Sequence, residues 1–160
     1  DIACRTPGIL CEAAAAAALA LFDRDTRVWL SPSADCSRVR KYLRSQTASI
    51  QVQERMLADF AIVARPGELP LLASFHRGTE ADPGSSTTLI VQVDSLEGNG
   101  PLRLSGPGIQ GARSIEAKGL GEAFLSQWSG NARLSPRGAD VLLVCGRRLC
   151  FLSRTIHIEV

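Results

Sequence analysis

Apolar residues occur in short runs that polar and turn-forming segments separate, a pattern typical of alternating helices and strands. The first run, residues 12–22, contains six consecutive alanines. Alanine has the highest helix propensity because its side chain loses almost no freedom, so this run is predicted to form a helix that packs closely against a sheet. Residues 27–30 follow as a short run of β-favouring side chains that Ser31 and Pro32 close.

A second helix is predicted up to Leu43, with either Asp35 or Ser37 as its N-cap. Four basic residues occupy most of its surface outside a narrow apolar face: Arg38, Arg40, Lys41 and Arg44. Such a surface is typical of exposure to solvent. A contact with phosphate or with an acidic partner stays open as an alternative, because clustered cations create a positive local field.

The middle of the chain predicts two further strands with a polar loop between them. Residues 60–63 form a short apolar run, and residues 69–75 suit a short helix. The loop at residues 77–86 is rich in turn-forming residues. Residues 87–93 favour β-structure, and their near-continuous apolarity predicts a strand that is covered on both faces.

The second half of the chain predicts two β-hairpins. A turn at residues 97–100 is expected to join the preceding strand to an antiparallel strand at residues 102–104. Residues 141–145 and 149–152 are expected to pair around Gly146.

Between these hairpins, residues 121–128 predict a helix with an apolar face of Ala123, Phe124 and Trp128. Because hairpins alternate with helices, the expected fold class is α/β. We expect residues 1–160 to form a single domain with a central mixed β-sheet flanked by helices.

The composition agrees with one soluble domain, since 160 residues of which 45% are hydrophobic suffice to bury a core. Lysine and arginine total 18 and nearly balance 16 acidic residues, and the net charge of +2 is too small to predict nucleic-acid binding. The longest apolar run is about half of a membrane span, so no membrane is expected as a partner. The sequence opens on Asp1 rather than methionine, which leaves the true N-terminus open.

Five cysteines form no CxxC pair: Cys4, Cys11, Cys36, Cys145 and Cys150. This pattern argues against a disulfide scaffold and against a structural zinc site, and it favours reduced thiols in the cytoplasm. Cys145 and Cys150 flank the second hairpin turn and could face each other there. The expected case is that they are buried thiols acting as small hydrophobic groups.

No stretch of the sequence carries a complete catalytic motif. Gly106, Gly108 and Gly111 have the spacing of a dinucleotide fingerprint, but they follow a late strand and lack the lysine and hydroxyl of a P-loop. The simpler interpretation is that Gly106 and Gly108 provide backbone angles or close approaches forbidden to larger residues. His76 and His157 lack metal-binding spacing, so no metal is expected. The only lysines, Lys41 and Lys118, lie in no pyridoxal-phosphate motif, and no cofactor is expected.

Short segments in a fixed order carry a family resemblance. They are residues 26–31, 58–63, 78–79 and 88–93 in the first half, and residues 102–109, 136–143 and 152–155 in the second. The segment at residues 102–109 contains a Gly-Pro-Gly-Ile signature. Each piece alone is weak, but in this joint order they resemble the PhnH family of phosphonate metabolism proteins.

The resemblance implies a subunit of the carbon-phosphorus lyase core complex, with PhnG, PhnI and PhnJ as partners. This complex forms α-D-ribose 1-methylphosphonate 5-triphosphate from ATP and methylphosphonate; nucleosidase chemistry is attributed to PhnI and radical cleavage to PhnJ. The resemblance also implies a homodimer. The implied fold is similar to a reduced large domain of pyridoxal-phosphate transferases without the cofactor.

The chain departs from the family pattern in two places. Family members usually carry a further N-terminal helical segment, which is expected to be missing here. Ser153 stands where a proline commonly precedes the arginine, and this change could loosen the turn that places Arg154.

Two hypotheses of function follow. In the first, the chain is a non-catalytic subunit that dimerises and docks onto the other lyase subunits. In the second, it holds an auxiliary site for ATP or the phosphonate, because arginine donates two hydrogen bonds to phosphate and a glycine turn presents backbone N–H groups. The anion-binding candidates are Arg77, Thr79, Arg154, Gly106 and Gly108. Their convergence on one cleft would favour the second hypothesis.

Overall fold

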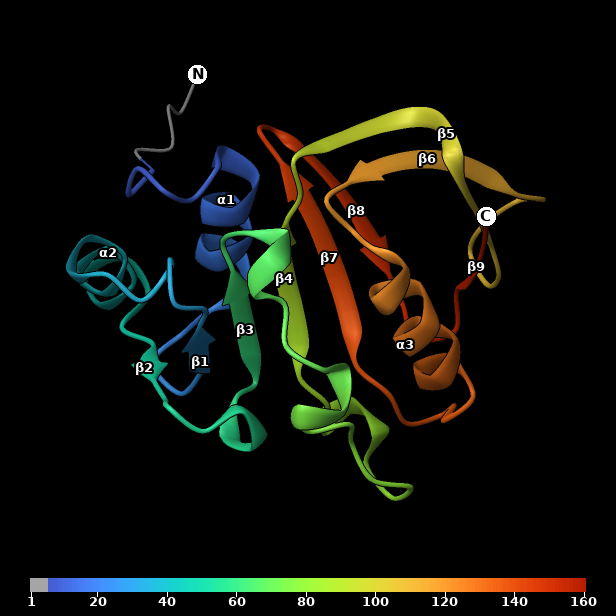
Figure 1. The fold of residues 1–160 in the computed structure, drawn as a ribbon. Helices are drawn as coiled ribbons and strands as arrows, with labels where there is room; N and C mark the ends of the chain where they lie inside the picture. Colours follow the sequence, from blue (N-terminus) through green and yellow to red (C-terminus); the bar gives the residue numbers. More distant parts are fainter. Residues whose placement is uncertain (1–5) are drawn as a thin grey trace.

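A six-stranded sheet forms the centre of the protein, whose computed structural model describes residues 6–160 (Figure 1). The strands lie in the order β2-β1-β3-β4-β7-β8; the first five are parallel, and β8 is antiparallel to β7. Their bounds are β1 Arg27–Leu30, β2 Ile50–Gln51, β3 Phe60–Val63, β4 Thr88–Gln92, β7 Asp140–Cys145 and β8 Arg148–Leu152. The mixed sheet confirms the predicted α/β class.

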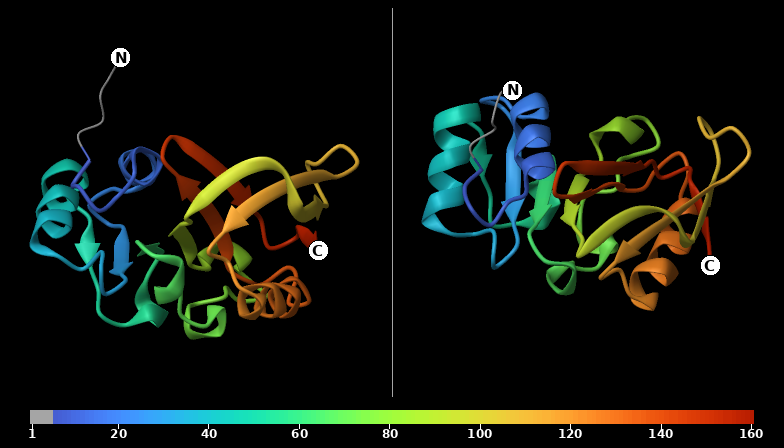
Figure 2. Two further views of the ribbon diagram at one scale, coloured as in Figure 1. Left: turned by 45° about the horizontal axis from the view of Figure 1, so that its top comes forward. Right: turned by 90° about the horizontal axis from the view of Figure 1, so that it is seen from above.

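Helices α1 (Glu12–Leu21) and α2 (Ser37–Thr47) cover one face of this sheet, whereas α3 (Glu122–Ala132) lies on the other face (Figure 2). A second, three-stranded sheet in the order β6-β5-β9 lies on the same side as α3. Its strands are β5 Ser95–Ser105, β6 Arg113–Lys118 and β9 His157–Glu159.

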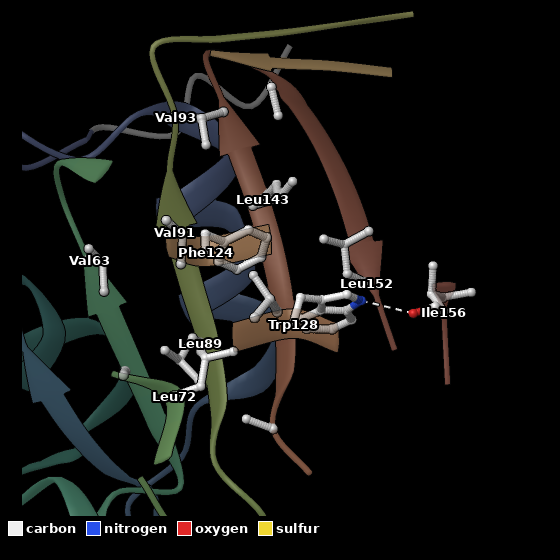
Figure 3. Close-up of a cluster of buried hydrophobic side chains, with 14 of the residues drawn as sticks. Val63, Leu72, Leu89, Val91, Val93, Phe124, Trp128, Leu143, Leu152 and Ile156 are labelled. Carbon is white, nitrogen blue, oxygen red and sulfur yellow. Dashed lines mark hydrogen bonds between the residues drawn. The ribbon is translucent and has the colours of Figure 1, made fainter. Parts of the chain in front are cut away.

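The central strands bury both of their faces, because successive side chains point in opposite directions. Ile62, Ile90 and Leu142 pack beneath α1 and α2. Val63, Val91 and Leu143 point the other way, into a cluster with Phe124 and Trp128 of α3 (Figure 3). This double burial explains the near-continuous apolar runs of the sequence.

The predicted helix at residues 12–22 is confirmed as α1 at Glu12–Leu21, and five of its seven alanines are buried: Ala13, Ala14, Ala15, Ala17 and Ala18. The second helix runs beyond the predicted end to Thr47, where Ala48 adopts a left-handed conformation (φ 56°) that stops it. Its N-cap is Cys36 rather than Asp35 or Ser37. Asp35 instead accepts a hydrogen bond from Arg40 Nε at 2.6 Å.

The first predicted hairpin is wrong. Strand β4 lies between β3 and β7 and is parallel to both, while β5 belongs to the second sheet and is antiparallel to β6 and β9. The residues predicted as a turn are part of β5, where Ile115 of β6 lies opposite both Gly98 and Leu102. The turn-forming residues therefore form a bulge within one strand instead of reversing the chain.

The second hairpin is confirmed, with β7 and β8 paired from Val141 opposite Leu152 to Cys145 opposite Arg148. Cys150 lies opposite Leu143, so its thiol does not face that of Cys145. The expected short helix within residues 69–75 is a single 3-10 turn at Leu72–Ser74.

Helix α3 begins after Gly121, one residue beyond the predicted start, and ends at Ala132. Phe124 and Trp128 are buried as expected, whereas Ala123 is exposed. The indole Nε1–H of Trp128 donates to the carbonyl of Ile156 at 2.8 Å (Figure 3). This bond ties α3 to the segment that leads into β9.

Candidate functional site

Arg154 follows β8, and all five N–H groups of its guanidinium have partners. Nε and Nη2 donate to the two carboxylate oxygens of Asp140, at 3.1 and 2.5 Å. Nη1 donates to the carbonyls of Pro83 and Pro136 at 2.6 and 3.3 Å, and Nη2 also donates to Ser86 Oγ at 2.7 Å. The Arg154 and Asp140 side chains are only 13% and 14% exposed. Arg154 therefore holds the loop before β4 and the loop before β7 against the start of β7.

The backbone around Arg154 is held independently of its side chain. Its N–H donates to Asp140 Oδ1 at 2.7 Å, and the Ile156 N–H donates to the Ser153 carbonyl at 2.8 Å. Ser153 Oγ lies 3.1 Å from Thr155 Oγ1. These bonds place Arg154 in a closed turn, with Ser153 at the position where a proline was expected.

Arg77 and Thr79 lie on the exposed loop before β4. Thr79 closes a turn with Asp82: its N–H donates to the Asp82 carbonyl at 3.1 Å, and its Oγ1 accepts from the Asp82 N–H at 2.9 Å. The Arg77 carbonyl accepts from the Gly138 N–H at 2.8 Å. The exposed side chain of Arg77 borders two small hollows of about 250 and 230 Å³ beside Leu134.

Gly106 and Gly108 form a tight turn after β5, and both adopt positive φ angles, 139° and 84°. A side chain at Gly106 would meet the carbonyl oxygen of Thr155 at 2.9 Å. The Gly106 carbonyl accepts from the Ile109 N–H at 3.1 Å, which closes the turn. The prediction that these glycines provide backbone angles or close approaches forbidden to larger residues is therefore confirmed.

The structure brings some of the predicted anion-binding residues near one another. Gly138, whose N–H donates to the Arg77 carbonyl, lies beside the Arg154 side chain, and Gly106 lies against Thr155. Arg77 and Gly108 border different hollows that share no lining residue. Arg154 uses its N–H groups within the protein, and Thr79 is bonded to Asp82. Anion binding by these residues stays a prediction, with Arg77 as the arginine whose side chain is open to solvent.

A groove of about 890 Å³ is lined by residues of β5, β6 and β8, strands that lie on the same side of the molecule in Figure 1. Its residues come from these three strands and from the connection between β5 and β6: Leu96, Glu97, Gly98, Leu104, Gly108, Ile109, Gln110, Arg113, Ile115, Arg148, Leu149, Cys150 and Phe151. Apolar side chains and guanidinium groups thus share one concave surface. Of the residues that the sequence predicted to bind anions, Gly108 is the one among these lining residues.

Positive charge exceeds negative charge in the groove. Arg148 is ion-paired with Glu97, and its Nη1 also donates to the Leu96 carbonyl at 3.1 Å. The exposed side chain of Arg113 makes no hydrogen bond or ion pair with any residue from 6 to 160. The groove therefore offers one guanidinium for an anionic group.

Strand β8 forms one edge of the central sheet and one wall of the groove. Leu149 and Phe151 are 60% and 54% exposed, whereas Leu152 is buried in the core. The alternating register explains this difference, since Leu149 and Phe151 lie opposite Val144 and Leu142, beyond the cover that α1 provides. Their apolar character was visible in the sequence, but the edge position of the strand was not.

Other reactive groups serve local packing. The Nδ1 atom of His76 lies 2.9 Å from the Ser85 carbonyl oxygen. Burial raises the pKa of the Cys150 thiol, which keeps it in the less nucleophilic protonated form. Within residues 6–160, no three or more histidine, cysteine or acidic side chains gather as metal ligands. No described helix has the length and apolarity needed to cross a membrane.

Comparison with known proteins places these features in a family. Residues 2–159 match the family described as "Bacterial phosphonate metabolism protein (PhnH)". The chain is 38% identical over 153 residues to the "Alpha-D-ribose 1-methylphosphonate 5-triphosphate synthase subunit PhnH" of Rhizobium meliloti (strain 1021), covering 96% of this chain and 76% of the relative. It is 33% identical over 116 residues to the "Putative C-P lyase subunit protein HtxG" of Stutzerimonas stutzeri, covering 72% of this chain and 55% of that protein. Because the match extends over nearly the whole sequence, the chain belongs to the PhnH family of bacterial phosphonate metabolism proteins.

Proposed function

We propose that the chain is a subunit of the carbon-phosphorus lyase core complex and acts there by docking rather than through its own active site. The complex forms α-D-ribose 1-methylphosphonate 5-triphosphate from ATP and methylphosphonate. Family membership carries the proposal, because the two relatives are named as a subunit of that synthase and as a putative C-P lyase subunit. The exposed apolar residues Leu149 and Phe151 support a docking role, since clustered apolar surface marks interaction sites.

The proposal names PhnG, PhnI and PhnJ as partners and includes a second copy of the chain in a homodimer. A location in the cytoplasm is supported by the free thiols of Cys11, Cys36, Cys145 and Cys150, because structural disulfides belong to oxidising compartments. The mostly parallel sheet with helices on both faces supports a fold similar to a reduced large domain of pyridoxal-phosphate transferases without the cofactor.

The alternative function, an auxiliary site for ATP or the phosphonate, has less support from the geometry. Arg154 has no free N–H to offer an anion, because Asp140, Ser86 and two carbonyls take all five. Arg77 and Gly108 border separate hollows. An anion in either hollow would therefore contact only one of Arg77 and Gly108.

Coexpression tests the proposal. The tagged chain is produced together with PhnG, PhnI and PhnJ of the same organism, and all three are expected to copurify with it. Calorimetry of the isolated chain with ATP and with methylphosphonate is expected to show no heat of binding. Failure of the three subunits to copurify would remove the docking role. Binding of ATP that an Arg77→Ala substitution abolishes would establish the alternative.

A further inference from the structure

Strand β8 presents an open edge. It pairs with β7 on one side, and no strand within residues 6–160 pairs with its other side. In an antiparallel pair, alternate residues turn their N–H and C=O groups away from the partner, so β8 offers unpaired backbone groups along Arg148–Leu152. Soluble proteins usually protect such an edge with charge, proline, a bulge or a covering segment. Here Leu149 and Phe151 are instead exposed on it.

The groove runs along this edge and has apolar residues on the side away from β8. That wall contains Leu104, Ile109 and Ile115. A strand added beside β8 would direct alternate side chains to opposite faces of the extended sheet. One row would lie next to Leu149 and Phe151, and the other row would point toward the wall. The groove therefore suits an extended segment with apolar residues on both faces.

Charge decides which segment fits. The groove contains the guanidiniums of Arg113 and Arg148 but only the carboxylate of Glu97, which is already paired with Arg148. Pairing β8 with β8 of a second copy would double this positive charge without adding a counter-charge. A segment with a carboxylate near Arg113 would neutralise it.

We infer that the groove binds an extended acidic strand of a partner lyase subunit, which pairs with the free edge of β8. This mode of recognition takes affinity from main-chain hydrogen bonds and specificity from side-chain contacts on either face. The inference rests on the proposed function and adds to it the surface used, the shape of the partner segment and its charge.

Two substitutions test the groove in the coexpressed complex. Phe151→Glu removes an apolar contact and repels an acidic strand, and Arg113→Glu reverses the charge that the strand would meet. Each should weaken capture of the partner subunits about tenfold, because loss of one central contact commonly costs that much. Both side chains are exposed in the free chain, so folding should be preserved.

Matched controls lie outside the groove. Leu71→Glu places an acid at another exposed leucine, and Arg44→Glu reverses a charge on α2; neither should change capture by more than about twofold. Hydrogen exchange then separates strand pairing from side-chain contact, since the β8 amides that point away from β7 should exchange more slowly in the complex than in the free chain.

The outcomes distinguish this inference from the function on which it rests. If wild-type chain captures no lyase subunit, both are overturned. If wild type and the two groove variants capture the subunits equally, or if β8 exchange is unchanged in the complex, only the inference is overturned. Protection, in the purified chain alone, of the β8 amides that point away from β7 would show that a second copy occupies the edge, which also overturns it.

Discussion

Arg154 shares its guanidinium among acceptors from three parts of the chain: the loop before β4, the loop before β7, and Asp140. Sequence reasoning selected Arg154 as an anion ligand because arginine matches the geometry of phosphate. Its anion in the folded protein is a carboxylate of the same chain. Asp140 precedes Arg154 by 14 positions, and no local pattern links the two because the β7–β8 hairpin brings them together.

Replacing Arg154 by lysine should lower the free energy of unfolding by about 2–3 kcal/mol. Lysine keeps the charge but cannot reach five acceptors, so some of the Pro83 carbonyl, the Pro136 carbonyl and Ser86 Oγ lose their donor. Asp140→Asn should cost about 3–5 kcal/mol because it leaves a buried cation without a counter-charge. Urea unfolding measures both. The control Arg77→Lys, on the exposed loop, should change the free energy of unfolding by less than about 0.5 kcal/mol. An equally small effect of Arg154→Lys would contradict the stabilising role of the Arg154 hydrogen bonds.

At the scale of elements, prediction succeeded where the signal was local. The alanine run, the apolar strands and the β7–β8 hairpin depend on nearby residues, and all were recovered. Strand β6 was missed because its sequence is mostly polar and it is defined by pairing with β5. The predicted pairing of β4 was wrong for the same physical reason. The sequence pattern indicates that a segment forms a strand, but its neighbours in the sheet are set by crossover connections between distant segments.

The bulge in β5 yields a test of this element. A methyl group at Gly100 would collide with the backbone N and Cα of Glu116 in β6, so Gly100→Ala should destabilise the protein by about 1–3 kcal/mol. Gly98→Ala is the matched control: a methyl group there meets nothing within 4 Å, and its effect should stay within about 1 kcal/mol of zero. Thermal unfolding of both variants compares them directly. Equal effects would mean that β6 does not approach β5 as closely as described.

At the scale of the whole molecule, the sequence was sufficient for the family but not for the groove. The family follows from ordered motifs, and the match over residues 2–159 agrees with that identification. The groove depends on Arg113 of β6 and Phe151 of β8 lining one hollow, which requires two sheets to be placed correctly. Each residue alone looks like an ordinary member of a strand.

Glu68 connects distant parts of the molecule at the ends of β1 and β3. Its Oε2 accepts from Ser31 Oγ at 2.6 Å and from the Ser33 N–H at 3.1 Å, and its Oε1 accepts from Ser33 Oγ. Ser31 Oγ in turn accepts from the Ala64 N–H at 3.1 Å. Burial raises the pKa of Glu68, but the hydrogen bonds from Ser31 and Ser33 together outweigh it and lower the pKa below its ordinary value.

This lowered pKa predicts how stability responds to acid. A carboxyl group with a lower pKa in the folded state contributes stability that is fully present above its unfolded pKa, about 4.3, and is lost as pH falls through the folded value. The difference in unfolding free energy between wild type and Glu68→Gln should therefore be constant near neutral pH and shrink below about pH 4. Urea unfolding across this range measures it, with Ser129→Ala on the exposed side of α3 expected to follow wild type in parallel. A Glu68→Gln curve parallel to wild type down to about pH 3 would show that the network around Glu68 carries none of the acid sensitivity.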